Sequence, residues 1–239
     1  MDPVSAFITA LLPIVKEKVN SIIGPIANDP SLLSKFMDQL LNFDESVRIS
    51  FNYDGGNAEC GWKGLAWDVM DTWFDQWLLV EKEFALKRYQ DIINAPNSGH
   101  IDYDSAPPGK MKTTYGAAQV TDLVKSVTNS YRKLRRFSHK ARFLIEIQAE
   151  IFDQYQGRLS DSLDAYQTIT SPLARKLHGV TKEQQAELEG IGGLDRLCRV
   201  YASAEHVNTT LKEWSNQDVS ITLLVSFDDC SLLIKIVLR

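Results

Sequence analysis

The chain has 239 residues, of which 44% are hydrophobic and 24% charged, proportions of a soluble protein with enough length to bury a core. Its net charge of −5 argues against a general nucleic-acid binder, because neutralising phosphates requires surplus lysine and arginine.

The first predicted helix covers about residues 3–23. Asp2 precedes it as a cap, and Pro3 suits the first turn. Pro13 is expected to kink or split this helix, because proline removes one backbone hydrogen bond. Gly24-Pro25 is expected to end it. Its apolar run is too short to span a membrane and lacks the basic start of a signal peptide.

Two further helices are predicted before residue 95. One runs from about residue 31 to 48, after the cap-like Asp29-Pro30, and the other from about 64 to 93, after a turn at Asp54-Gly55. The second of these carries many aromatic side chains, which we interpret as core rather than as a ligand cage. They are Trp67, Trp73, Phe74, Trp77, Phe84 and Tyr89.

A polar linker separates these helices from the next helical stretch. We therefore divide the chain into an N-terminal helical bundle segment (1–95), a polar linker loop (96–115), a long-helix bundle segment (116–216) and an atypical tail (217–239). The tail has two β-branched, apolar runs around Asp228-Asp229, a pattern typical of a strand or hairpin. It is expected to be β-like or disordered.

The stretch from residue 116 to 169 dominates the pattern. It has no proline, and apolar residues return every three or four positions, as on one helix face. A single unbroken helix here has about 50 residues and a length of about 75 Å. Such a rod is typical of a scaffold, so the predicted fold is all-α: elongated antiparallel helical bundles with one very long helix.

After Ser171-Pro172 the sequence predicts shorter helices. One covers about residues 173–177, and another begins at the capping-box pattern from Thr181 to Gln184. The glycines from Gly190 to Gly193 are expected to end it. A last helix is predicted from about residue 194 to 214.

Catalytic and metal-binding motifs are sparse. His100, His139, His178 and His206 stand at no metal-ligand spacing, and HExxH, GxSxG and phosphate-loop patterns are absent from the sequence. Asp102 and Asp104 with His100 fit an acidic loop better than a metal site. We expect no enzyme, no cofactor, no metal and no small-molecule substrate. The widely spaced Cys60, Cys198 and Cys230 favour a reducing compartment.

One charged stretch is a candidate binding surface. Its simplest interpretation is a solvated helix face paired with acidic neighbours. The alternative is a docking patch for an acidic partner or for anionic lipid headgroups. Its members are Arg132, Lys133, Arg135, Arg136, Lys140 and Arg142.

Several short motifs along the chain resemble those of a known family. They are Trp62-Lys63-Gly64-Leu65, Thr114-Tyr115-Gly116, Phe137-Ser138-His139, Arg142-Phe143-Leu144-Ile145, Leu177-His178-Gly179-Val180-Thr181 and Lys212-Glu213-Trp214-Ser215-Asn216. In number and order they resemble the fungal branch of the RINT/TIP family, whose members are subunits of the Dsl tethering complex at the endoplasmic reticulum. The resemblance spans roughly residues 1–216.

The resemblance implies stacked helical bundles and a non-enzymatic role in capturing Golgi-derived, COPI-coated vesicles that return to the endoplasmic reticulum. It implies the other Dsl-complex subunits and endoplasmic-reticulum SNAREs as partners, and a cytoplasmic, peripheral location on that membrane. Because members of this family are much longer, we expect a partial chain without their N-terminal coiled coil and distal bundles. Its tail also departs from the family pattern.

The alternative function is a peripheral membrane-surface helical protein that binds anionic lipid through the basic stretch. In this alternative, binding depends on the positive charge of the basic stretch, whereas partner binding by a tether does not. Reversing Arg135 and Arg136 should abolish lipid binding in this alternative and leave partner binding largely intact in a tether.

Overall fold

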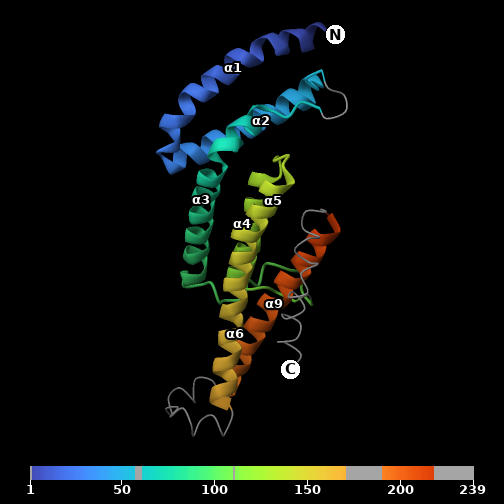
Figure 1. Ribbon diagram of the computed structural model, residues 1–239. Helices are drawn as coiled ribbons and strands as arrows, with labels where there is room; N and C mark the ends of the chain where they lie inside the picture. Colours follow the sequence, from blue (N-terminus) through green and yellow to red (C-terminus); the bar gives the residue numbers. More distant parts are fainter. Residues whose placement is uncertain (1, 57–60, 110, 171–189, 218–239) are drawn as a thin grey trace. The chain divides into compact units, whose positions relative to one another are not determined.

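The computed structural model describes residues 2–56, 61–109, 111–170 and 190–217 (Figure 1). Within these ranges the regular elements are helices, and β pairing is limited to one isolated bridge between Ile101 and Thr114. The predicted all-α class is therefore confirmed. The elements are α1 (Pro3–Ala27), α2 (Pro30–Phe51), α3 (Leu65–Asn94), α4 (Tyr115–Tyr131), α5 (Phe137–Phe143), the π-helix η1 (Leu144–Ala149), α6 (Glu150–Thr170) and α9 (Ile191–Gln217).

The first two helices begin where their caps predict. Asp2 accepts a hydrogen bond from the backbone N of Ser5, and Asp29 accepts from Ser31 and Leu32. The predicted end of α1 at Gly24-Pro25 is wrong, since the helix continues to Ala27 with Pro13 and Pro25 inside it. Figure 1 shows α1 as one curved helix, so the missing proline N–H groups bend it without splitting it.

The predicted 50-residue helix is wrong, because α4 ends at Tyr131 and the chain turns through residues 132–136 before α5. The rings of Tyr131 and Phe143 lie 5.2 Å apart, whereas a straight helix would separate these positions by about 18 Å. Further along the two arms, the Gln148 amide donates to the Val124 carbonyl at 3.2 Å. Each helix of a helical hairpin buries one face, so its apolar residues recur with the same 3.6-residue period as in a single long helix. The periodicity therefore does not distinguish the two.

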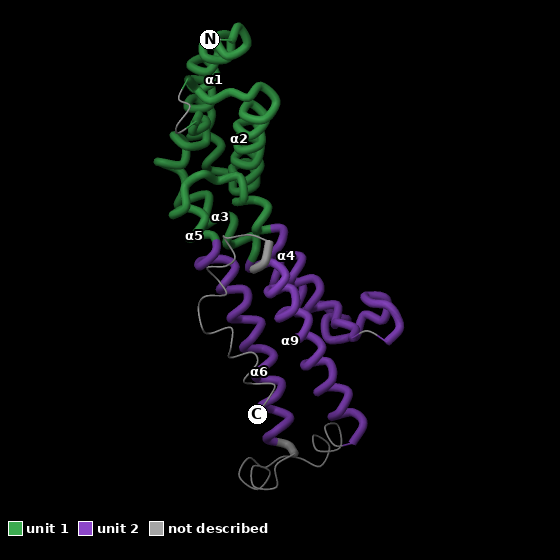
Figure 2. Tube along the Cα trace, turned by 90° about the vertical axis from the view of Figure 1, so that its right-hand side faces the viewer, with its two compact units in different colours: residues 1–85, 127–143 green, residues 86–126, 144–239 purple. Residues whose placement is uncertain are grey.

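The chain forms two compact units, each built from two separate segments (Figure 2). Unit 1 comprises residues 1–85 and 127–143, and unit 2 comprises residues 86–126 and 144–239. The domain division at the polar linker stays a prediction.

The core of unit 1 joins α1, α2, the first part of α3 and the turn-back segment. Its aromatic centre is Phe74 and Trp77 of α3 with Tyr131 and Phe143, all at most 4% exposed. The rings of Trp77 and Phe143 lie 4.9 Å apart. The core interpretation of the α3 aromatics is thus confirmed for these two and for Tyr89, whereas Phe84 is 41% exposed.

Unit 2 is built around α6 and α9, which run side by side and antiparallel (Figure 1). Its buried side chains come from α3, α4, η1, α6 and α9, among them Tyr89, Val120, Ile147, Ile151 and Val207. Across the buried centre, the hydroxyls of Thr114 and Ser203 lie 2.7 Å apart. This pair fixes the start of α4 against α9.

The predicted linker loop is anchored to the start of α4. The backbone N of Gly116 donates to the Ser98 carbonyl at 2.8 Å, and a side chain at Gly116 would meet Ser98 atoms at 2.4 Å. At the other end of unit 2, Gly190 (φ +72°) precedes α9. The predicted helices at 173–177 and from Thr181, and the β-like tail 218–239, lie outside the described residues.

Candidate functional site

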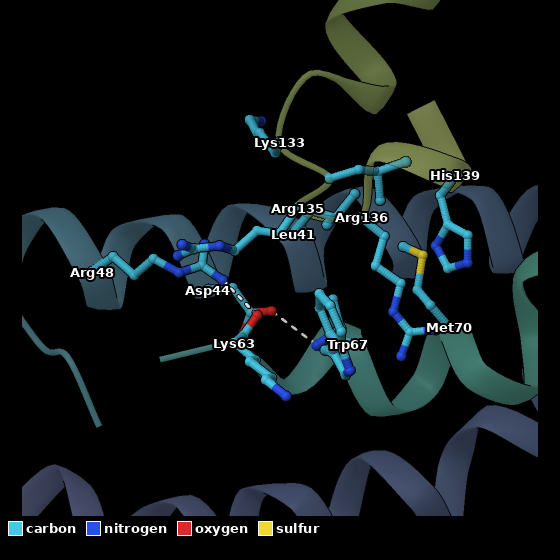
Figure 3. Close-up of a pocket in the computed structure, with 12 residues that line it drawn as sticks. Leu41, Asp44, Arg48, Lys63, Trp67, Met70, Lys133, Arg135, Arg136 and His139 are labelled. Atoms are coloured by element: carbon cyan, nitrogen blue, oxygen red, sulfur yellow. Dashed lines mark hydrogen bonds between the residues drawn. The ribbon is translucent and has the colours of Figure 1, made fainter. Parts of the chain in front are cut away.

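The six predicted site residues gather in unit 1, on the turn 132–136 and on α5, and we call them the basic cluster. Their placement on a continuous rod was wrong, because the chain reverses at this point. Two further cations lie at the same surface: Arg48 of α2 and Lys63, which precedes α3. Together with Lys133, Arg135 and Arg136 they line one small pocket (Figure 3).

The floor of this pocket is a buried carboxylate, Asp44 of α2. Its two oxygens accept hydrogen bonds from the backbone N of Leu65 (2.9 Å) and of Ala66 (2.8 Å), the first residues of α3. Asp44 therefore caps α3 from a different helix. Its pKa is raised by burial, against the opposing effects of these two bonds and of Arg48.

Arg48 completes this join by holding the segment before α3. Its Nε donates to the Trp62 carbonyl at 3.2 Å, and its Nη2 donates to the Lys63 carbonyl at 2.9 Å. Gly64 lies beneath with φ +96°, and a Cβ there would sit 2.3 Å from Asp44 Oδ2. Only glycine fits so close to the carboxylate in this conformation.

Arg136 is the most integrated member of the basic cluster. It forms an ion pair with Asp71 of α3, and its guanidinium lies 4.0 Å from the ring centre of Trp67. Its side chain is 24% exposed, and its Nε is buried without a hydrogen-bond partner in the described part of the chain. Arg136 thus binds the turn to α3 by charge and by cation–π stacking.

Arg142 repeats this arrangement six residues further along the chain, near the end of α5. It pairs with Asp75, and its guanidinium lies 5.2 Å from the Phe74 ring centre. Between the two arginines, the His139 ring stacks on Phe74 at 3.7 Å. The pKa of His139 is lowered by burial first and then by Arg136 and Arg142, so this imidazole is neutral at neutral pH.

The remaining four members of the basic cluster differ in their exposure to solvent. Lys133 donates to the Asn42 side chain of α2, and Arg135 Nη1 donates to the Trp62 carbonyl at 3.4 Å. Lys140 is half-buried, whereas Arg132 and Arg135 are exposed. The interpretation of a charged face paired with acidic neighbours fits Arg136 and Arg142. Arg132 and Arg135 are the members a partner or a headgroup could reach.

The sequence shows the local run of cations but does not place Arg48 and Lys63 beside it. These residues come from separate segments, and only the fold brings them to the turn. No run or spacing in the sequence indicates that Arg48 and Lys63 lie beside the turn. The one available hint is the Trp62-Lys63-Gly64-Leu65 motif, whose glycine is required by the Asp44 contact.

The pocket itself holds about 20 Å³, room for about one water molecule. Within the described ranges, His, Cys, Asp and Glu form no group of three suited to a metal ion, including the loop with His100, Asp102 and Asp104. Among the described helices, none has the length and apolar character that crossing a membrane requires. The arrangement is a charged, aromatic-backed surface suited to macromolecular or headgroup contact.

Comparison with known proteins gives one family match. The model of the RINT-1/TIP-1 family matches residues 1–231. A RINT1-like protein of Drosophila melanogaster is 24% identical over 153 residues, which cover 64% of this chain and 20% of the fly protein. Protein transport protein tip20 of Schizosaccharomyces pombe is 19% identical over 235 residues, 93% of this chain and 31% of that protein. No solved structure matches. The chain spans only about a fifth to a third of these curated relatives.

Proposed function

The chain belongs to the RINT-1/TIP-1 family, and from this premise we propose that it is a non-enzymatic part of a vesicle-tethering complex at the endoplasmic reticulum. Its role would be in retrograde transport from the Golgi, with other Dsl-complex subunits and endoplasmic-reticulum SNAREs as partners. The family match over residues 1–231 carries this proposal. The name of the fission yeast relative, protein transport protein tip20, agrees with this proposal.

The helical fold supports the same role. Both units consist of packed helices, and the pocket at the basic cluster is too small for a metabolite. A peripheral location on the endoplasmic-reticulum membrane, facing the cytoplasm, belongs to this proposal and follows from the expected partners.

Affinity purification tests the tether. The gene product that carries this chain is tagged at its chromosomal locus, purified from cell extract and analysed by mass spectrometry. We expect Dsl-complex subunits and endoplasmic-reticulum SNAREs to be enriched over an untagged control. If neither class is enriched, the tethering proposal is wrong.

A second candidate function is binding to an anionic membrane surface through the basic cluster. The exposure of Arg132 and Arg135 favours it, because these side chains can reach headgroups without disturbing the core. Arg136 is a poor probe, since its reversal would also break the contacts with Asp71 and Trp67.

Liposome sedimentation separates the two candidates. The variant Arg132→Glu/Arg135→Glu is compared with Lys18→Glu/Lys35→Glu, a control that changes the net charge equally at exposed positions of unit 1. Membrane binding through the basic cluster predicts loss of anionic-liposome binding in the first variant alone. Equal liposome binding by the wild type and both variants would show that the basic cluster is not a membrane-binding surface.

A further inference from the structure

Three arginines line one cavity in unit 2. Arg158 comes from α6, and Arg196 and Arg199 come from α9, where their spacing places them on one face. The cavity has a volume of about 250 Å³, and α6 and α9 both contribute to its lining. Three guanidinium groups around one space repel each other unless negative charge balances them.

Among the described residues, two of these guanidiniums have partners for only a few of their donors. Nη2 of Arg158 donates to the Ile93 carbonyl at 3.2 Å, and Nε of Arg196 donates to the Ser162 hydroxyl at 3.1 Å. Each arginine has five N–H donors in a planar fork. With respect to the described part of the chain, both guanidinium groups can therefore still donate hydrogen bonds to an anion in the cavity.

Arg199 is held more firmly. Nη2 pairs with Asp195 at 2.7 Å, and Nη1 donates to the Gly99 carbonyl at 3.3 Å. Its Nε is buried and has no hydrogen-bond partner among the described residues. A buried N–H without a partner costs free energy that a bound acceptor would recover.

Hydroxyl groups fill much of the remaining lining. They belong to Ser98, Ser162, Ser203, Thr114 and Tyr155. Burial, the largest effect, raises the pKa of Tyr155, so its phenol keeps its proton at neutral pH. The cavity therefore offers neutral hydrogen-bonding groups next to its three cations.

The cavity adjoins a wider groove of about 610 Å³ that shares Arg158, Ser162 and Arg196. The groove has one acidic lining residue, Asp161, and the cavity has none. The lining of the cavity is therefore more positively charged than the lining of the adjoining groove.

We propose that this cavity binds a phosphomonoester on a small polyol, an inositol phosphate that is either free or the headgroup of a lipid. A phosphomonoester carries nearly two charges and three strong acceptor oxygens, which suit several arginine forks better than the single charge of a carboxylate. The polyol hydroxyls would pair with the serine, threonine and tyrosine hydroxyls. This site is separate from the basic cluster and does not depend on the tethering proposal.

Isothermal titration of the purified 239-residue chain with inositol trisphosphate tests the site. The variant Arg158→Gln/Arg196→Gln is compared with Lys87→Gln/Arg88→Gln, a control with the same charge change at exposed positions of unit 2 that line neither space. We expect saturable binding by the wild type and the control. Binding should be weaker by about tenfold or more in the arginine variant, since each arginine supplies charge-assisted hydrogen bonds.

Two additions complete the test. Arg158→Lys/Arg196→Lys keeps the charge but not the fork, so it should fold, as checked by circular dichroism, and bind less tightly than the wild type. Phosphatidylcholine vesicles with and without phosphatidylinositol bisphosphate distinguish the sources: binding to these vesicles indicates a lipid headgroup, and binding of the soluble probe alone indicates a free ligand. No saturable binding by the wild type, equal affinity in all variants, or binding of polyglutamate alone would overturn the proposal.

Discussion

At the scale of single residues, Asp44 connects two helices of unit 1. One buried carboxylate satisfies two N–H groups at the start of α3, and Arg48 holds the segment just before it. The join of α2 to α3 thus depends on polar groups in a buried place, where an unsatisfied donor is costly.

Replacing Asp44 by alanine should lower the free energy of unfolding by about 2 kcal/mol, because it removes a cap and leaves two buried donors unpaired. Urea unfolding followed by tryptophan fluorescence measures the change. Asp38→Ala is the control: Asp38 is exposed on the same helix and should cost less than about 0.5 kcal/mol. Equal losses in the two variants would contradict the capping role.

Gly64 gives a second prediction at this scale. Gly64→Ala should destabilise unit 1 by about 2 kcal/mol or more, because φ is +96° and the new Cβ would collide with Asp44 and Arg48. Gly24→Ala is the matched control, since its Cβ meets no atom within 4 Å and it lies inside α1, where alanine favours the helix. Thermal unfolding should move in opposite directions for the two variants.

At the scale of elements, the break between α4 and α5 defines the fold of unit 1. No glycine or proline marks it. It forms because Tyr131 packs on Phe143 and because Arg136 and Arg142 pair with Asp71 and Asp75 of α3. The two ion pairs join residues 65 and 67 positions apart in the sequence.

The two phenylalanines of α5 test how this helix is held. Phe143 is fully buried between Trp77 and Tyr131, so Phe143→Ala should cost about 3–5 kcal/mol. Phe137 is 63% exposed, and Phe137→Ala should change stability by less than about 0.5 kcal/mol. Chemical denaturation of both variants checks the contrast, and a small effect at Phe143 would contradict the packing of α5.

His206 joins α9 to α4 and makes the stability of unit 2 sensitive to pH. Its Nε2 lies 3.1 Å from Thr121 Oγ1, and burial lowers its pKa against Asp122 and Glu213, which raise it. As the pH falls through about 6.5, the unfolded imidazole binds a proton that the folded one resists, so stability is lost. The loss between pH 7.5 and pH 5.5 should be smaller in His206→Gln than in the wild type.

The same urea titrations apply to His139. His139→Gln should also reduce the loss, because burial lowers the pKa of His139 too. An unchanged pH dependence in His206→Gln would show that the Thr121 contact does not control the titration.

The helices also show which parts of the fold could be predicted from the sequence and which could not. The starts of α1 and α2 and the extent of α3 follow from local signals such as Asp29 and the run of aromatic residues, and they were predicted within a few residues. The turn at 132–136 was not, because periodicity records which face is buried and not the direction of the chain. For the site, the local run of cations was visible, whereas Arg48 and Lys63 join it only through the fold.

At the scale of the whole molecule, each unit draws on two segments that are distant in sequence. A cut at the polar linker would therefore leave unit 1 without residues 127–143, which include Tyr131, Leu134 and Phe143 of its core. This arrangement makes a different prediction from a domain that ends at residue 95.

Two fragments test whether residues 127–143 are required for unit 1 to fold. A fragment of residues 1–143 contains all of unit 1 and should unfold cooperatively in urea. A fragment of residues 1–95 should expose the surface around Trp77, bind the dye ANS and unfold without a sharp transition. Cooperative unfolding of the shorter fragment would show that residues 1–95 form a domain by themselves.

The distribution of indole rings has an optical consequence. Of the five tryptophans, Trp62, Trp67, Trp73 and Trp77 lie in unit 1 and Trp214 lies in unit 2. Emission excited at the red edge of the absorption band therefore comes mostly from unit 1, whereas peptide-bond ellipticity arises from both. The native chain thus carries its own spectroscopic label, and a gap between the two melting midpoints would measure how independently the units lose their structure.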